Sequence, residues 1–188
     1  MKLALALSLS CLLAAPVLGL PAFAQTALSQ VGVTTAPPWN QTGQEFAQAM
    51  LTSDKFEIEA SELAVERGSD PVRDFARQMI AAHTQSAEDV KAVADHTLVG
   101  LTITPPPVLD PRHMEMYREL EASYGPDFDR AYIAQQFDVH HEARDRLEAY
   151  AHNGQIWQLR RFARQMAPVI DNQLAMLRSL RGEMASNQ

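Results

Sequence analysis

Hydrophobic residues recur every three or four positions in five stretches of this chain, the spacing that gives a helix one apolar face. The spacing predicts helices over about 42–67, 70–98, 110–125, 126–154 and 155–181. No segment shows the strict alternation of apolar and polar residues that is typical of a β-strand. We therefore expect an all-α protein with four long helices and one short helix.

Residues that favour helix ends and turns separate these stretches. Thr42-Gly-Gln-Glu45 is a capping box, and Asp70-Pro71 places a capping side chain directly before a proline. Three consecutive prolines at 105–107 predict an extended crossover between the second and third helices. Pro168 lies inside the last predicted helix, where the missing backbone N–H predicts a kink.

A weak internal repeat links the two halves of the chain. Phe75-Ala-Arg-Gln-Met79 recurs as Phe162-Ala-Arg-Gln-Met166, in the second and fifth predicted helices. Two related helical hairpins joined by a long crossover form the ferritin-like architecture. We therefore predict a ferritin-like up-down four-helix bundle whose long crossover carries a short extra helix. Chance similarity between amphipathic helices is the alternative explanation of the repeat.

The first 24 residues have the features of a secretory signal peptide. Lys2 is followed by an apolar stretch, and Ala22-Phe23-Ala24 is a small-x-small cleavage site. A lipoprotein signal ending at Cys11 is the alternative, although Ser8 stands where a lipobox usually has leucine. We expect a periplasmic or secreted protein that begins at Gln25 and has no transmembrane segment.

Composition divides the rest of the chain into three parts. Residues 25–41 carry no charge and include two adjacent prolines, so we expect a flexible N-terminal linker there. The predicted bundle occupies 42–182, and we expect a disordered tail at 183–188.

Charge and cysteine content exclude several kinds of partner and chemistry. Without the signal peptide, 15 Lys and Arg face 23 Asp and Glu, a formal charge of −8 that disfavours nucleic acid as a partner. The single cysteine, Cys11, lies in the signal, so the mature chain has neither a disulfide nor a thiolate ligand.

Each of the four long helices places one polar residue within or beside its apolar face. Glu57 and His83 lie in the middle of that face, His140 on its flank and Gln173 inside it. Residue counts from the predicted turns, at ~1.5 Å per residue, bring Glu57, His83 and His140 to a similar depth. The depth of Gln173 depends on the kink at Pro168. A buried carboxylate must be neutral, paired with a cation or bound to a metal.

Two interpretations of this group follow. Glu57, His83 and His140, with Gln173 as a weak fourth group, would suit one divalent ion such as Zn²⁺, Fe²⁺ or Cu²⁺. Alternatively, the Glu and His side chains form a structural polar pair with a water molecule.

Other metal motifs are weaker. A two-iron bundle uses two Glu-x-x-His motifs, which this chain lacks; the nearest segment is Asp138-Val-His-His141. His113-Met-Glu-Met116 is a minor candidate for copper, since helix packing explains its methionines equally well.

The pattern resembles a family of bacterial exported proteins, the domain of unknown function 4142 family, over about residues 43–180. The resemblance is carried by Glu57, by Phe75, Met79 and His83, by Tyr132 and His140, and by Pro168. It implies a ferritin-like fold and export, but no reaction, because the family has none assigned. Two positions depart from its pattern: Ala82 stands where the family usually has Asp, and Gln173 where it often has His.

Together these features predict a small exported protein that binds a metal ion in its core, with a redox or stress-protective role. The alternative is a non-enzymatic envelope or stress-associated module in which the same residues form a polar core. The sequence does not decide whether the protein is an enzyme. It is compatible with a homo-oligomer and indicates no particular protein partner.

Overall fold

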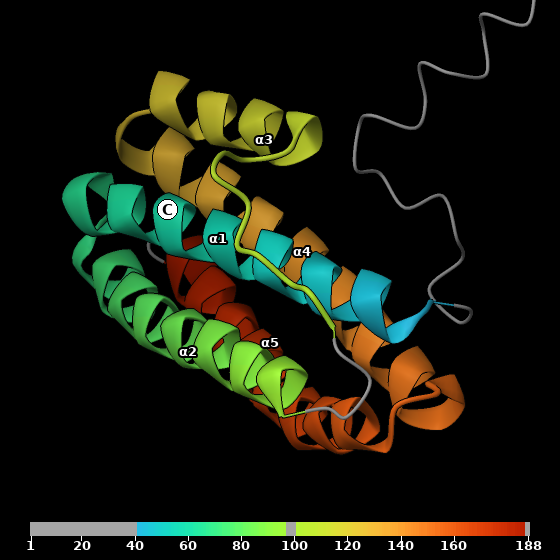
Figure 1. Cartoon of the computed structure of the whole chain (residues 1–188). Coiled ribbons are helices and arrows are strands. Elements are labelled where there is room, and N and C mark those ends of the chain that lie inside the picture. Colours follow the sequence, from blue (N-terminus) through green and yellow to red (C-terminus); the bar gives the residue numbers. More distant parts are fainter. Residues whose placement is uncertain (1–40, 97–100, 187–188) are drawn as a thin grey trace, which may run out of the picture. The chain divides into compact units, whose positions relative to one another are not determined.

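The computed structural model describes residues 41–96 and 101–186, and these form five helices (Figure 1). They are α1 (Gly43–Arg67), α2 (Asp70–Asp95), α3 (Pro111–Ala122), α4 (Gly125–Asn153) and α5 (Trp157–Ser186). No β-strand occurs among the described residues, so the predicted all-α class is confirmed for them. The predicted signal peptide and nearly all of the predicted linker lie outside the described residues.

The four long helices pack as two hairpins. Two residues, 68 and 69, separate α1 from α2, so α2 must run back along α1, and these two helices contact each other extensively. A short turn likewise joins α4 to α5, which form the second hairpin. The hairpins meet through α1 against α4 and α2 against α5, while α3 lies against α1 and α4 (Figure 1). This is the helix pairing that the sequence predicts.

The segment between α2 and α3 follows the outside of α1. The side-chain amides of Gln44 and Gln48 donate to the carbonyls of Thr102 and Thr104. At the other end of α1, the Arg67 guanidinium donates to the Glu121 carbonyl at the end of α3. The described part of the crossover and α3 therefore run in the same direction as α1 and deliver the chain to the start of α4.

Local capping explains where two of these helices begin. The Thr42 side chain accepts a hydrogen bond from the backbone N–H of Glu45, whose carboxylate accepts one from the backbone N–H of Thr42. This is the predicted capping box. The Asp110 carboxylate caps α3 in a similar way, accepting from the N–H groups of Arg112 and His113.

The core contains large apolar side chains from all the long helices. Phe46 stacks on Tyr150 with 4.0 Å between ring centres, which joins α1 to α4 near one end of the molecule. The repeated phenylalanines Phe75 and Phe162 are both 4 % exposed, so the repeat corresponds to equivalent core positions on α2 and α5. The apolar faces read from the sequence are therefore the faces that pack together.

The last helix differs from the prediction at its end. It continues to Ser186, beyond the expected end near Arg181, so residues 183–186 form its last turn rather than the start of a tail. The Ser186 hydroxyl donates to the Glu183 carbonyl in this turn. Pro168 lies inside this helix, as the sequence predicts, and it has no N–H to donate.

Candidate metal centre

Three polar residues on α1 share the buried face of that helix. Asp54, Glu57 and Ser61 are three and four positions apart, the spacing that places side chains on one side of a helix. The exposed fractions of Asp54 and Glu57 are 1 %, and that of Ser61 is 0 %. The sequence thus presents two carboxylates to the core one turn apart.

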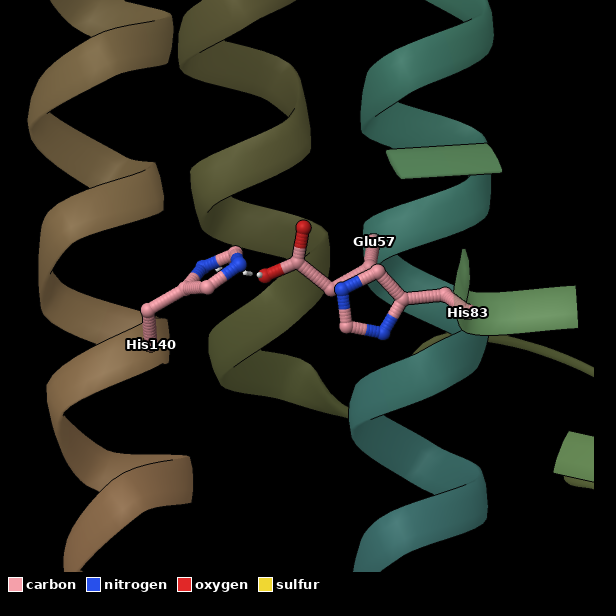
Figure 2. A group of neighbouring side chains, drawn as sticks. All are labelled: Glu57, His83 and His140. Atoms are coloured by element: carbon pink, nitrogen blue, oxygen red, sulfur yellow. Dashed lines mark ion pairs between the residues drawn. The ribbon is translucent and has the colours of Figure 1, made fainter. Parts of the chain in front are cut away.

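His83 from α2 and His140 from α4 converge on Glu57 (Figure 2). Each of the three residues offers one possible ligand atom, and these atoms all lie within 4.8 Å of one another. The carboxylate of Glu57 lies between the two imidazoles, whose ring centres are 5.6 Å apart with perpendicular planes (Figure 2). The predicted convergence of these three residues is therefore present in the structure.

The His140 ring is held by its own helix and by α1. Its Nδ1 lies 2.8 Å from the backbone carbonyl of Gln136, one turn earlier on α4, and 3.5 Å from Glu57 Oε1. A carbonyl oxygen only accepts, so Nδ1 carries the hydrogen of the neutral ring. The lone pair is then on Nε2, which is buried and has no hydrogen-bond partner.

His83 is held in the same manner by a different group. Its Nδ1 lies 2.8 Å from Asp54 Oδ1, and both side chains are buried. An ionised Asp54 accepts a hydrogen bond from Nδ1–H of the neutral His83 ring, which places the lone pair on Nε2. Like Nε2 of His140, Nε2 of His83 is buried without a hydrogen-bond partner. Both imidazoles thus have one nitrogen bonded and the other free.

One carboxylate oxygen of Glu57 also has a hydrogen-bond partner. The side-chain amide of Gln136 donates to Glu57 Oε2 at 2.7 Å. Gln136 therefore contacts two members of the group, Glu57 through its side chain and His140 through its backbone carbonyl.

Burial and the neighbouring charges act differently on the two histidines. Burial lowers the pKa of His140, and the negative charge of Glu57 only partly offsets this. Burial also disfavours charge on His83, but the hydrogen bond to Asp54 and the charge of Glu57 raise its pKa overall. Burial raises the pKa of Asp54 despite its hydrogen bond to His83. The Asp54–His83 pair therefore retains a proton more strongly than either group would in water, whereas His140 gives up its proton more readily.

Gln173, the fourth predicted residue, reaches the same region from α5. It is 4 % exposed, and its side chain lies against the His140 ring. Its Oε1 is buried without a hydrogen-bond partner. The proline five positions earlier therefore does not displace Gln173 from the group.

Sequence reasoning missed Asp54 and Gln136. Both had a visible signal, because Asp54 is four positions after the core residue Met50 and Gln136 is four positions after the core residue Tyr132. Tyr132 itself donates to or accepts from Ser61 at 2.8 Å, in a second buried contact between α1 and α4.

The other metal motifs considered from the sequence do not join this group. His113 pairs with Asp110 through Nδ1 and stacks on Phe56, with 4.7 Å between ring centres. Met114 and Met116 are partly buried against the core. Asp138 is exposed, and the neighbouring His141 is exposed and stacks on Phe137.

The fold and this group define an all-helical protein with a buried carboxylate–imidazole cluster between two helical hairpins. The chain belongs to the family described as Domain of unknown function (DUF4142), whose family model matches residues 28–180.

Comparison with solved structures finds a similar fold in "Crystal structure of DUF305 fragment from Deinococcus radiodurans". The TM-score is 0.62 at 17 % sequence identity, over 80 % of this chain and 99 % of that one. No curated protein matches the chain. None of the described helices has the length and apolar character needed to cross a membrane.

Proposed function

We propose that this protein binds one divalent transition-metal ion in the core of a ferritin-like four-helix bundle, through Glu57, His83 and His140. One observation supports this most directly. Both imidazoles have Nδ1 hydrogen-bonded and Nε2 buried without a partner, beside a buried carboxylate. In metal sites the ligating histidine is typically oriented through its other nitrogen by a carboxylate or carbonyl.

The free atoms around the group also favour a cation. Four buried side-chain atoms in and beside it accept no hydrogen bond: His83 Nε2, Gln136 Oε1, His140 Nε2 and Gln173 Oε1. The Ser86 hydroxyl lies beside Asp54 and donates to that carboxylate. With neutral imidazoles, all four atoms can only accept. Because buried acceptors without a donor are costly, a positive ion stabilises this arrangement better than further acceptors would.

The types of donor limit the kind of ion. Two imidazoles and one carboxylate suit Zn²⁺, Fe²⁺ or Cu²⁺, and Gln173 is placed to act as a weak fourth ligand. The only cysteine of the chain is Cys11, so thiolate does not contribute to the site. A single carboxylate in the group favours one ion over the paired ions of two-iron bundles.

We further propose that the protein acts outside the inner membrane, in the periplasm or as a secreted protein, with a redox or stress-protective role. The support is the signal-peptide pattern that ends at Ala24, together with the sequestered position of the site. Mass spectrometry of material exported by the cell should show an N-terminus at Gln25. A lipid attached to Cys11 would contradict this.

The alternative is a non-enzymatic envelope module whose polar core needs no metal. The hydrogen bonds from Gln136 to Glu57 and between Asp54 and His83 favour it, since they already satisfy part of each carboxylate. This interpretation and the metal proposal predict different responses to added ions.

The test is metal content and ion-dependent stability. Protein purified from the periplasmic fraction should contain about one transition-metal ion per chain by mass spectrometry. The metal-free protein should gain thermal stability with Zn²⁺, Fe²⁺ or Cu²⁺, because an ion that binds only the folded state adds RT ln(1 + [L]/Kd) to its stability.

Two variants make the test specific. His83→Ala should abolish the ion-dependent gain, whereas His141→Ala should retain it, because His141 is exposed and stacks on Phe137. If none of the three ions stabilises the wild-type protein and none is co-purified, the metal proposal is wrong and the polar core remains.

A further inference from the structure

We infer that Asp54 is the positioning residue that sets the metal affinity of this site, by fixing the ring of His83. The inference rests on the proposed metal binding and concerns a residue that no motif in the sequence marks. Asp54 is not one of the three residues that converge, yet it is as deeply buried as Glu57.

The contact itself is specific. Asp54 Oδ1 lies 2.8 Å from His83 Nδ1, and the two residues come from the facing helices α1 and α2. A carboxylate at this position selects the form of the ring with hydrogen on Nδ1 and directs the lone pair to Nε2. Without it, a neutral His83 would be free to carry its hydrogen on Nε2, where it would block binding of an ion.

The hydrogen-bond acceptors of the two histidines differ, and this difference shows the effect of Asp54 on His83. The Nδ1–H of His140 donates to a neutral acceptor, the backbone carbonyl of Gln136. The Nδ1–H of His83 donates instead to a carboxylate, that of Asp54. An anionic partner makes the opposite nitrogen a stronger donor to a metal ion than a neutral partner does. We therefore expect the bond from His83 to the ion to depend on Asp54, and the bond from His140 not to.

The test compares Asp54→Asn with a matched control. The asparagine is nearly the same size and can still accept the Nδ1 hydrogen, but it has no charge. Asp129→Asn is the control, since Asp129 is also buried, at 5 % exposure, and accepts a hydrogen bond from the backbone N–H of Ser69 in the turn between α1 and α2, away from the metal site.

Zn²⁺ dissociation constants should be measured by competition with a chromophoric chelator, and the visible spectrum of the Co²⁺-loaded protein should be recorded. Asp54→Asn should weaken Zn²⁺ binding by about 10- to 100-fold, the usual effect of losing such a partner, and should shift the Co²⁺ bands. Asp129→Asn should lower thermal stability and leave both metal measurements unchanged. A purely structural role for Asp54 would lower stability without moving the Co²⁺ bands.

The outcomes separate this inference from the proposed function. If Asp54→Asn binds Zn²⁺ as tightly as the wild type and with the same Co²⁺ spectrum, the role of Asp54 is wrong although the metal site stands. If the wild type binds neither ion, the proposed function fails, and the inference fails with it. Circular dichroism of each variant establishes that it is folded. Asp54→Glu keeps the negative charge, so it should bind Zn²⁺ more tightly than Asp54→Asn and recover part of the lost affinity.

Discussion

Gln136 on α4 donates a hydrogen bond to the carboxylate of Glu57 on α1, at 2.7 Å and out of reach of solvent. The same residue accepts from His140 through its backbone carbonyl. One glutamine therefore orients both groups where the two hairpins meet.

Gln136→Ala should lower the free energy of unfolding by about 1–3 kcal/mol, because it leaves a buried carboxylate oxygen without its donor. Urea denaturation monitored by circular dichroism measures this change. Gln165→Ala is the control, since Gln165 is exposed on α5, and it should change stability by less than about 0.5 kcal/mol. Equal effects of the two substitutions would contradict the importance of the Gln136–Glu57 contact.

The buried contact between Ser61 and Tyr132 predicts a non-additive pair of substitutions. Tyr132→Phe and Ser61→Ala should each destabilise the protein by about 1–2 kcal/mol, because each leaves the other hydroxyl buried without its partner. The double variant should lose less than the sum of the two, since neither polar group remains. Strict additivity in a double-mutant cycle would mean that the two hydroxyls do not interact.

The N-cap of α3 predicts a dependence of stability on pH. Partial burial acts to raise the pKa of Asp110, but hydrogen bonds from the His113 ring and from the backbone N–H groups of His113 and Arg112 lower it overall. A carboxylate with a lowered pKa in the folded state stabilises the protein above its unfolded pKa of about 4. That contribution to stability is lost as the pH falls through the pKa of Asp110 in the folded protein.

Asp110→Ala should therefore cost about 1 kcal/mol of unfolding free energy at neutral pH and progressively less below pH ~4. Denaturant titrations of the wild type and the variant at several pH values give this difference. Asp74→Ala, which removes an exposed ion pair with Arg77, should cost less than about 0.5 kcal/mol at every pH. A cost at Asp110 that grows on acidification would have the wrong sign.

Gln173→His should strengthen metal binding if the proposed site is correct. Gln173 already lies against the His140 ring, and imidazole is a better ligand than an amide for Zn²⁺ or Cu²⁺. Each tenfold gain in affinity adds about 1.4 kcal/mol of stability at saturating ion, which a thermal shift series with Zn²⁺ detects. If the folded variant shows the same thermal shift with Zn²⁺ as the wild type, residue 173 does not bind the ion.

Much of the fold follows from the sequence because the signals are local. Thr42 and Glu45 form the capping box that their spacing indicates, and the apolar spacing identifies the helix faces that pack. The sequence predicts that the last helix ends near Arg181, directly before Gly182, whereas α5 continues through this glycine to Ser186. A glycine costs helix stability without necessarily ending a helix.

Some residues of the candidate site could be predicted from the sequence, and others could not. Glu57, His83 and His140 were identified because each interrupts an apolar face. The positions of Asp54 and Gln136 one turn after core residues indicate that they face the core, but they do not reveal which side chain of the opposite helix lies at the same level. Only the packing of α1 against α2 and α4 brings Asp54 to His83 and Gln136 to Glu57.

The polar contacts between the hairpins also fix how they can dock. Sliding α4 by one turn along α1 would move it about 5.4 Å and separate the Gln136 amide from Glu57. Apolar side chains would find similar neighbours after such a slide, but the carboxylate would be left buried without its donor, at a cost of about 1–3 kcal/mol. The register between the two hairpins is thus set by a few hydrogen bonds, which penalise misaligned assembly more strongly than the apolar packing alone can.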